Sequence, residues 1–129
     1  MKEPDRRLNE LTERVIGAAI EVHKAPGPGY LESVYEAAFA IELELRNVTF
    51  ERQPQFKQAY KGREVGIARP DFLVERELIV ELKAVESLLP IHTAQIISYL
   101  RTTGVHLGLL LNFNVTIMKS GVRRVVLSD

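Results

Sequence analysis

The chain has 129 residues, of which 46% are hydrophobic and 26% are charged. This composition predicts a single domain over residues 1–129 with a packed core, and it excludes a globally disordered chain. The 17 basic and 17 acidic side chains give a formal net charge of zero, which counts against a tight, sequence-blind binder of nucleic acid. The absence of cysteine excludes disulfides and cysteine-ligated zinc sites.

Hydropathy along the chain bears on its location. No apolar run approaches the ~20 residues that a membrane-spanning helix needs. The N-terminal residues 1–5 are charged rather than apolar, unlike a signal peptide. We therefore expect a cytoplasmic protein that does not bind membranes.

Two helices are predicted in the N-terminal third of the chain. The first covers about 25 residues and ends at the proline- and glycine-rich run 24–29. The second follows directly and ends near Asn47. Their apolar faces are predicted from helical spacing as Leu8, Leu11, Val15, Ala19 and Val22 in the first helix and Leu31, Val34, Ala38, Ile41 and Leu45 in the second.

Strands are predicted from Val48 to about Lys83. The run 50–60 mixes polar and aromatic residues, with Pro54 at an edge or bulge and a turn at Lys61-Gly62. Residues 65–74 and 78–82 then predict two strands joined around residues 75–77.

The C-terminal third predicts a helix over residues 91–103, with Pro90 in its first turn and Gly104 as its cap. The apolar run 105–111 predicts a strand buried on both faces, and residues 117–127 predict one or two more strands. A helix between two strands requires a crossover, so these strands can run parallel. The fold class is therefore α/β or α+β, a mixed central sheet flanked by helices in the order α-α-β-β-β-α-β-β.

Basic residues cluster in the middle of the chain and near its end. They are either part of a nucleic-acid-binding patch or charges on solvated strand edges. The members are Lys57, Lys61, Arg63 and Arg69, followed by Lys119, Arg123 and Arg124.

The sharpest chemical feature is Pro70-Asp71, followed after nine residues by Glu81-Leu82-Lys83. Glu81 and Lys83 share one strand face because side chains alternate along a strand. A loop of odd length centred on Arg76 would place Asp71 opposite Glu81, with Cβ atoms ~5 Å apart. A two-residue loop at 75–76 would instead pair Asp71 with Val80 and separate the carboxylates.

Two carboxylates and a backbone carbonyl, here that of Leu82, are ligands that suit Mg²⁺. Such an ion promotes phosphodiester hydrolysis by neutralising phosphate charge and lowering the pKa of a water molecule. Lys83 can reach the same phosphate. The alternative is that Asp71, Glu81 and Lys83 form only a salt-bridged hairpin surface.

Pro70-Asp71…Glu81-Leu82-Lys83 resembles the signature of the PD-(D/E)XK nuclease superfamily. The run Gly29-Tyr30-Leu31-Glu32-Ser33-Val34-Tyr35 is similar to the motif of the GxxExxY family, which is usually assigned to that superfamily. The resemblance extends from Ile16 to Phe113. It implies a restriction-endonuclease-like fold.

The resemblance also implies roles for residues. Asp71 and Glu81 would bind the metal, Mg²⁺ or Mn²⁺, together with the Leu82 carbonyl. Lys83 would be the catalytic lysine, and Glu32 a helix-borne acid that reaches the metal, in some branches through water. Gln95 and Tyr99 match a Q-x-x-x-Y element that shapes the site in helicase-nuclease enzymes.

Each supporting residue also has a structural interpretation. Glu32 would favour the start of its helix if Gly29 is the cap. Tyr35 can be a core aromatic, and Gln95 with Tyr99 a polar stripe one turn apart. His23 can line the site or cap a helix end. His106 is expected to be a core or edge residue.

These observations predict a metal-dependent phosphodiesterase that acts on DNA, or on RNA, through metal-activated water. The alternative is a catalytically silent domain of the same fold that binds a protein or a nucleic acid. Because so small a chain offers little surface beyond the site, we also expect a homodimer.

Overall fold

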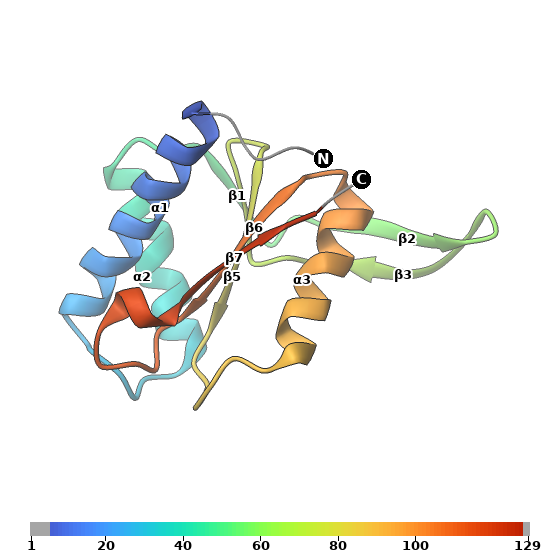
Figure 1. The fold of residues 1–129 in the computed structure, drawn as a ribbon. Coiled ribbons are helices and arrows are strands. Elements are labelled where there is room, and N and C mark those ends of the chain that lie inside the picture. The colour runs from blue at the N-terminus through green and yellow to red at the C-terminus, as the bar shows by residue number, and fades with distance from the viewer. Residues whose placement is uncertain (1–5, 128–129) are drawn as a thin grey trace.

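The computed structural model of this chain describes residues 6–127, so the start of the first predicted helix, residues 1–5, lies outside the described residues. Figure 1 shows a central sheet with helices on both of its sides. The elements are α1 Arg6–Lys24, α2 Glu32–Leu45, β1 Phe50–Arg52, β2 Phe56–Tyr60, β3 Arg63–Ala68, β4 Phe72–Val74, β5 Leu78–Lys83, α3 Pro90–Thr103, β6 Leu107–Asn112, the 3₁₀ turn η1 Met118–Gly121 and β7 Val122–Val126.

The main sheet has five strands in the order β1-β4-β5-β6-β7. Only β5 and β6 run parallel, and α3 makes the crossover between them. The other neighbouring pairs are antiparallel. This arrangement confirms the predicted mixed sheet flanked by helices.

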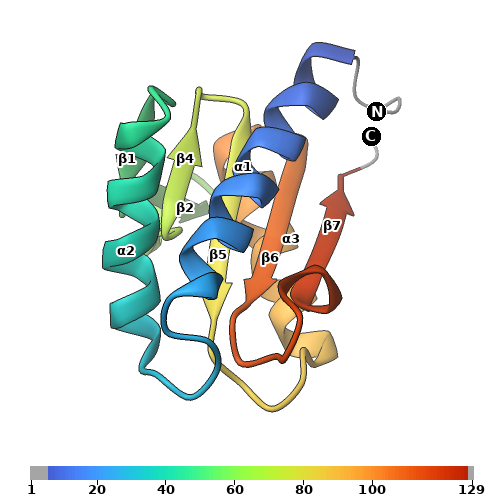
Figure 2. The same ribbon diagram turned by 90° about the vertical axis from the view of Figure 1, so that its left-hand side faces the viewer.

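Each face of the sheet has its own core. Side chains of α1 and α2 pack with Leu78, Val80 and Leu82 of β5 on one face. On the other face, Ile96 and Leu100 of α3 pack against residues that include Ile79. Figure 2 shows α1 and α2 in front of the sheet with α3 behind it. Alternation along β5 therefore directs Glu81 and Lys83 to the α3 side.

The predicted continuous strand over residues 65–74 is wrong. β3 ends at Ala68 and pairs only with β2 in a separate ribbon, whereas β4 begins at Phe72 and joins the main sheet. Pro70 lies in the break, where its missing N–H could not continue a strand ladder. Likewise, residues 50–60 form two strands in different sheets, so the described residues 6–127 hold seven strands where five or six were expected.

The predicted apolar face of α2 is also wrong. Leu31 and Leu45 are 75% and 73% exposed, and Val34 and Ile41 are exposed as well. The face that packs against the core carries Tyr35, Glu36, Phe39, Ala40 and Leu43 instead. Both sides of α2 are apolar, so the larger aromatic side chains decide which side is buried.

Local signals at the helix ends are confirmed. Pro90 is the first residue of α3, and Gly104 caps its end in the left-handed conformation with φ 77°. Asn47 follows α2 with φ 57°, and the N–H groups of Asn47 and Val48 donate to carbonyls of the last turn at 3.0 Å each. The turn at Lys61-Gly62 is also present.

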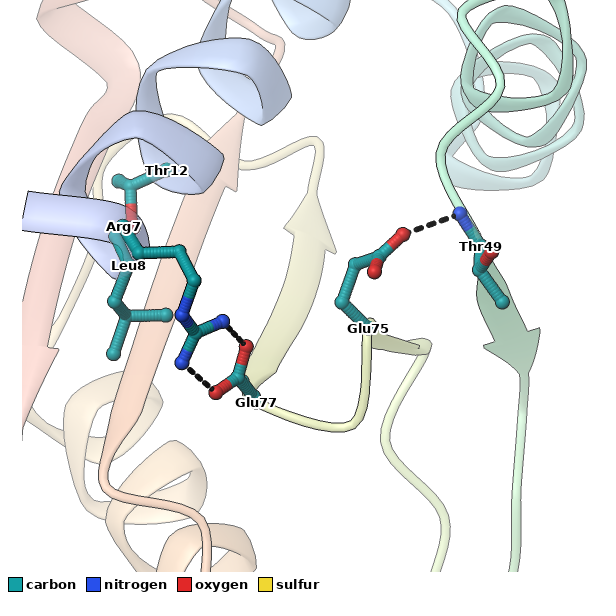
Figure 3. A network of polar contacts seen from close by, with 6 residues as sticks. All are labelled: Arg7, Leu8, Thr12, Thr49, Glu75 and Glu77. Carbon is teal, nitrogen blue, oxygen red and sulfur yellow. Dashed lines mark hydrogen bonds and ion pairs between the residues drawn. The ribbon is translucent and has the colours of Figure 1, made fainter.

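The turn between β4 and β5 sets the register of the predicted site. Glu75 and Arg76 both have positive φ, and the Glu77 N–H closes the turn on the Val74 carbonyl at 3.0 Å. Figure 3 shows contacts that hold this turn. The Arg7 guanidinium donates hydrogen bonds to both carboxylate oxygens of Glu77. The Glu75 carboxylate accepts a bond from the Thr49 N–H at 2.8 Å. Residues 75–77 thus form the odd-length loop.

Within residues 6–127, none of the helices is long and apolar enough to span a lipid bilayer.

Candidate active site

Asp71 and Glu81 face each other at the end of the sheet where β4 begins and β5 ends. The register pairs Phe72 with Val80, so Asp71 is placed opposite Glu81. The Asp71 N–H donates to Glu81 Oε1 at 2.6 Å, and the Leu82 N–H donates to Asp71 Oδ2 at 2.8 Å. Each carboxylate is therefore oriented by a backbone N–H through one oxygen, which leaves its second oxygen for another partner.

Burial disfavours the ionised form of these two acids. Glu81 is only 3% exposed and Asp71 is half-buried. Burial is the main cause that raises the pKa of Asp71 to about 6 and the pKa of Glu81 to about 8. The charge of Asp71 raises the Glu81 pKa further. A cation between them would remove this repulsion.

Lys83 is linked to α3 across the site. Its Nζ donates to Gln95 Oε1 at 3.0 Å, and Gln95 Nε2 donates to the Tyr99 hydroxyl at 3.3 Å. The Lys83 charge lowers the pKa of both Asp71 and Glu81, partly offsetting their burial. Burial, and then the charges of Glu81 and Asp71, raise the pKa of Tyr99. The fold thus brings the three predicted hairpin residues together with Gln95 and Tyr99.

Glu32 reaches the same region from the start of α2. Burial raises its pKa, whereas the nearby charges of Lys83 and His92 lower it. His92 is fixed at the start of α3, where its Nδ1 accepts a bond from the Leu89 N–H at 3.0 Å. Gly29 is not the N-cap of α2. Leu31 takes that position without a side-chain bond, so Glu32 is the first residue of the helix.

The Leu82 carbonyl points toward the site. In a strand, the N–H and C=O of one residue point to the same side, and the Leu82 N–H points to Asp71. The Lys83 carbonyl points the opposite way and accepts a bond from the Phe113 N–H at 2.9 Å. The backbone geometry therefore makes the Leu82 oxygen available beside the carboxylates.

His23 and Tyr35 lie beside the site and bond to backbone groups. The buried His23 ring bonds the Val115 carbonyl through Nε2 at 2.7 Å. The Tyr35 ring stacks on Phe113 with centroids 4.8 Å apart, and its hydroxyl donates to the Gly27 carbonyl. The Tyr35 contact fixes the loop before Glu32, and the His23 contact fixes the loop after β6. A role of either residue in substrate binding stays a prediction. His106 is exposed at the start of β6.

A buried acid, Glu36, was not identified from the sequence. It lies one turn after Glu32 and accepts bonds from Arg52 Nε and Gln53 Nε2, both at 2.9 Å. The Gln53 N–H in turn donates to the Asp71 carbonyl at 2.8 Å, and Gln53 has φ 51°. Glu36 therefore positions the start of β4. The i, i+4 spacing from Glu32 was the available signal.

Asn112 is a second positioning residue that sequence reasoning missed. It is buried at the end of β6, where its side chain accepts a bond from the Val85 N–H at 3.1 Å and donates to the Val85 carbonyl at 2.9 Å. These paired bonds fix the segment that follows Lys83. A lone asparagine after an apolar strand gave no signal for this role.

Within residues 6–127, no three His, Cys, Asp or Glu side chains lie close enough together to hold a metal ion by themselves. A metal ion held by the facing pair Asp71 and Glu81 would therefore need further ligands from backbone, water or substrate oxygens.

Comparison with known proteins identifies the superfamily of the chain. No curated protein and no solved structure shows a significant match to the chain. A sequence model described as the PD-(D/E)XK nuclease superfamily matches residues 9–125, which is nearly the whole chain. The order of helices and strands is consistent with a restriction-endonuclease-like fold. The chain therefore belongs to the PD-(D/E)XK nuclease superfamily.

Proposed function

We propose that this chain is a nuclease that hydrolyses phosphodiester bonds in nucleic acid, with DNA favoured over RNA, and that Asp71 and Glu81 hold its divalent metal. The observation that carries the proposal is the pair of opposed carboxylates, each oriented by a backbone N–H, with Lys83 beside them. A salt-bridged surface hairpin would leave both acids exposed, whereas Glu81 is buried.

The donor set fits Mg²⁺, or Mn²⁺ in its place. Mg²⁺ is usually bound by one or two carboxylates and keeps several waters and substrate oxygens. Asp71, Glu81 and the Leu82 carbonyl would hold the ion, and Glu32 would reach it through water. When bound, the ion supplies charge neutralisation at the phosphate and lowers the pKa of the attacking water.

The protein's own side chains then have separate tasks. Glu81 releases its proton before it can act as an anionic ligand, because its metal-free pKa is about 8. Lys83 offsets negative charge that grows on the phosphate in the transition state. Gln95 holds the Lys83 ammonium in place, and Tyr99 orients Gln95. We assign Tyr35 to the support of the loop before Glu32 and His23 to the support of the loop after β6.

We also assign the chain to the GxxExxY branch of the superfamily. Gly29 has φ 101°, a conformation that L side chains rarely adopt, so glycine suits this position. Glu32 follows at the start of α2, and Tyr35 bonds back to the loop through its hydroxyl. Each residue of the motif thus has a distinct physical task.

A homodimer is the assembly that we propose. The exposed apolar side chains Leu31, Val34, Ile41 and Leu45 on α2 offer a surface for self-association. Light scattering at micromolar concentration tests this, because a monomeric mass would contradict it. The cytoplasmic location stays a prediction from the sequence.

The test of the activity is metal-dependent cleavage of plasmid and of labelled oligonucleotides by the purified chain. Asp71→Asn with Glu81→Gln should abolish cleavage in Mg²⁺ or Mn²⁺. Glu13→Gln, which removes an exposed carboxylate from α1, is the control and should cut like the parent. If the double variant also cuts like the parent, the site assignment is wrong.

The alternative function is a silent nuclease-fold domain that binds a protein or a nucleic acid. It is favoured by the observation that residues 6–127 contain no three-ligand cluster. Calorimetry with Mn²⁺ and a non-cleavable oligonucleotide separates the two functions. Heat of metal binding that disappears with Glu81→Gln supports the nuclease, and the absence of any metal binding supports the silent domain.

A further inference from the structure

A groove is lined by residues of α3 and β2. Figure 1 shows the β2–β3 ribbon beside α3, on the side of the sheet away from α1 and α2. The volume of the groove is about 470 Å³. Gln58 Nε2 donates to Thr102 Oγ1 at 3.3 Å and connects the two walls. The lining residues are Lys57, Gln58 and Ala59 from β2 and Ser98, Arg101 and Thr102 from α3.

The chemistry of this lining suits an anion. Lys57 and Arg101 face the groove from opposite walls, are exposed, and have no ion-pair partner among residues 6–127. The Ser98 hydroxyl and the second N–H of the Gln58 amide add hydrogen-bond donors, whereas the Thr102 hydroxyl already donates to the Ser98 carbonyl at 2.9 Å. None of the six lining residues is acidic. Unpaired cations with neutral donors are typical of surfaces that contact phosphates.

The ribbon extends the positive surface beyond the groove. Lys61 and Arg63 are exposed at its tip, and Lys61 Nζ lies 5.3 Å from the centre of the exposed Tyr60 ring. An exposed aromatic ring among cations can stack with a base of a single strand. Three of the four basic residues that the sequence groups together therefore lie along one ribbon.

Helix α3 joins the groove to the candidate active site. Its Gln95 and Tyr99 face Lys83, whereas Arg101 and Thr102 face the ribbon. From Gln95 to Thr102 the helix rises about 10 Å. That rise is about three nucleotides of one strand at ~3.4 Å each.

We propose that this groove binds the phosphodiester backbone of the substrate strand about three nucleotides from the bond that is cut. The inference rests on the proposed nuclease function and adds where the strand lies. Lys57 and Arg101 each neutralise a phosphate, and the contacts ignore base identity because they involve only the backbone.

The test measures binding of a labelled 20-nucleotide strand by fluorescence anisotropy at increasing KCl, with EDTA present so that no metal contributes. Lys57→Gln with Arg101→Gln should raise Kd at least tenfold at low salt. It should also reduce the slope of log K against log salt by about 1.4, or roughly 0.7 for each lost phosphate contact. DNA and RNA of the same sequence are compared, and a larger loss with one of them identifies the preferred strand.

Arg14→Gln with Lys24→Gln is the matched control. It removes one arginine and one lysine from exposed positions on α1, which packs on the other face of the sheet from α3. The control should keep the parent's slope, and both pairs should keep the parent's thermal midpoint.

Three results would overturn the inference. The groove variant could keep the parent's slope of log K against log salt, the groove and control variants could lose affinity equally, or the parent could fail to bind the strand at low salt. Cleavage is read in a separate assay. If Asp71→Asn with Glu81→Gln still cuts while the groove variant shows the reduced salt slope, the proposed metal site is wrong and the proposed groove is supported. If the groove variant keeps the parent's salt slope while cleavage depends on Asp71 and Glu81, the groove proposal is wrong and the proposed metal site is supported.

Discussion

Asp71 donates its backbone N–H to the Glu81 carboxylate at 2.6 Å, while its own carboxylate accepts the N–H of Leu82, the residue after Glu81, at 2.8 Å. The two acids are thus fixed to each other's strands. Such bonds favour ionised carboxylates, but burial outweighs them and raises both pKa values, helped by repulsion from Asp71 on Glu81 and from Glu36 and Glu32 on Asp71. The pair is therefore held in position to receive a cation while its protons are easily displaced.

The first prediction concerns the stability of the metal-free protein against pH. The pKa values of both acids are raised from about 4 in the unfolded chain to about 6 for Asp71 and about 8 for Glu81. A raised folded pKa contributes stability at low pH that is lost as pH rises through that value. The thermal midpoint in EDTA should therefore fall between about pH 5 and pH 8.

Two comparisons sharpen this measurement. Mn²⁺ should raise the midpoint most near pH 8, where it competes with the fewest protons. Glu81→Gln should flatten the pH dependence in EDTA. A midpoint that rises between pH 5 and pH 8 in the parent would contradict the proposed protonation of the pair.

The second prediction concerns the turn that sets the register. Arg76 has φ 59°, which costs an L residue about 1–2 kcal/mol, whereas glycine adopts this conformation freely but loses more entropy on folding. Arg76→Gly should therefore raise the free energy of unfolding by about 0.5 kcal/mol. Arg76→Val should lower it, because a β-branched residue is poorly accommodated at positive φ. Urea denaturation measures both, and the same sign for the two variants would argue against this turn.

Arg76 also shows what the sequence could not decide. Neither Glu75 nor Arg76 is a usual residue for positive φ, so local turn preferences leave the two- and three-residue loops equally open. Contacts with residues distant in sequence select the three-residue loop. The Arg7 side chain donates to the Glu77 carboxylate, and the Thr49 N–H donates to the Glu75 carboxylate. In contrast, Pro90 and Gly104 act through local backbone conformation, and the bounds of α3 followed from them.

Helix α2 was harder to orient for a related reason. Apolar residues line two of its sides, and the 3-4 spacing of Leu31, Val34, Ala38, Ile41 and Leu45 matched a helix period better than the buried set did. Periodicity measures only that apolar residues share a face. Which face is buried depends on the shape of the sheet beneath, and this is not a local property.

The third prediction tests that orientation. Phe39 is fully buried and packs edge-on against Phe72 with ring centres 5.1 Å apart, so Phe39→Ala should cost about 3–5 kcal/mol of unfolding free energy. Ile41 is 59% exposed, so Ile41→Lys should change the unfolding free energy of a single chain by no more than about 0.5 kcal/mol. The reverse ranking in urea denaturation would mean that α2 packs through its other face.

The fourth prediction concerns the buried acid Glu36. Glu36→Ala removes two bonds, and because Arg52 is 44% exposed, water replaces part of the loss. We expect a cost of about 1–2 kcal/mol in unfolding free energy. Cleavage should fall as well, since Gln53 no longer fixes the Asp71 carbonyl.

A double-mutant cycle checks the assignment of Glu36. Arg52→Ala in the Glu36→Ala background should cost less than Arg52→Ala alone, because their shared bond is already gone. Additive costs would mean that the two residues act independently and that Arg52 does not connect Glu36 to the start of β4.

The last prediction separates the tasks of Lys83, Gln95 and Tyr99. Lys83→Ala should cause the largest loss of kcat, because it removes the charge near the phosphate. Gln95→Ala should lower kcat roughly tenfold, because it releases the Lys83 ammonium without removing it. Tyr99→Phe should lower kcat less, since it removes only the 3.3 Å bond that orients Gln95.

Thr93→Ala is the control for these variants. It removes a bond to Arg123 from the same helix and should leave kcat unchanged. Steady-state cleavage in Mg²⁺ at saturating oligonucleotide ranks the kcat of the four variants. A loss in Gln95→Ala as large as in Lys83→Ala would mean that Gln95 contacts the substrate itself rather than acting through the lysine.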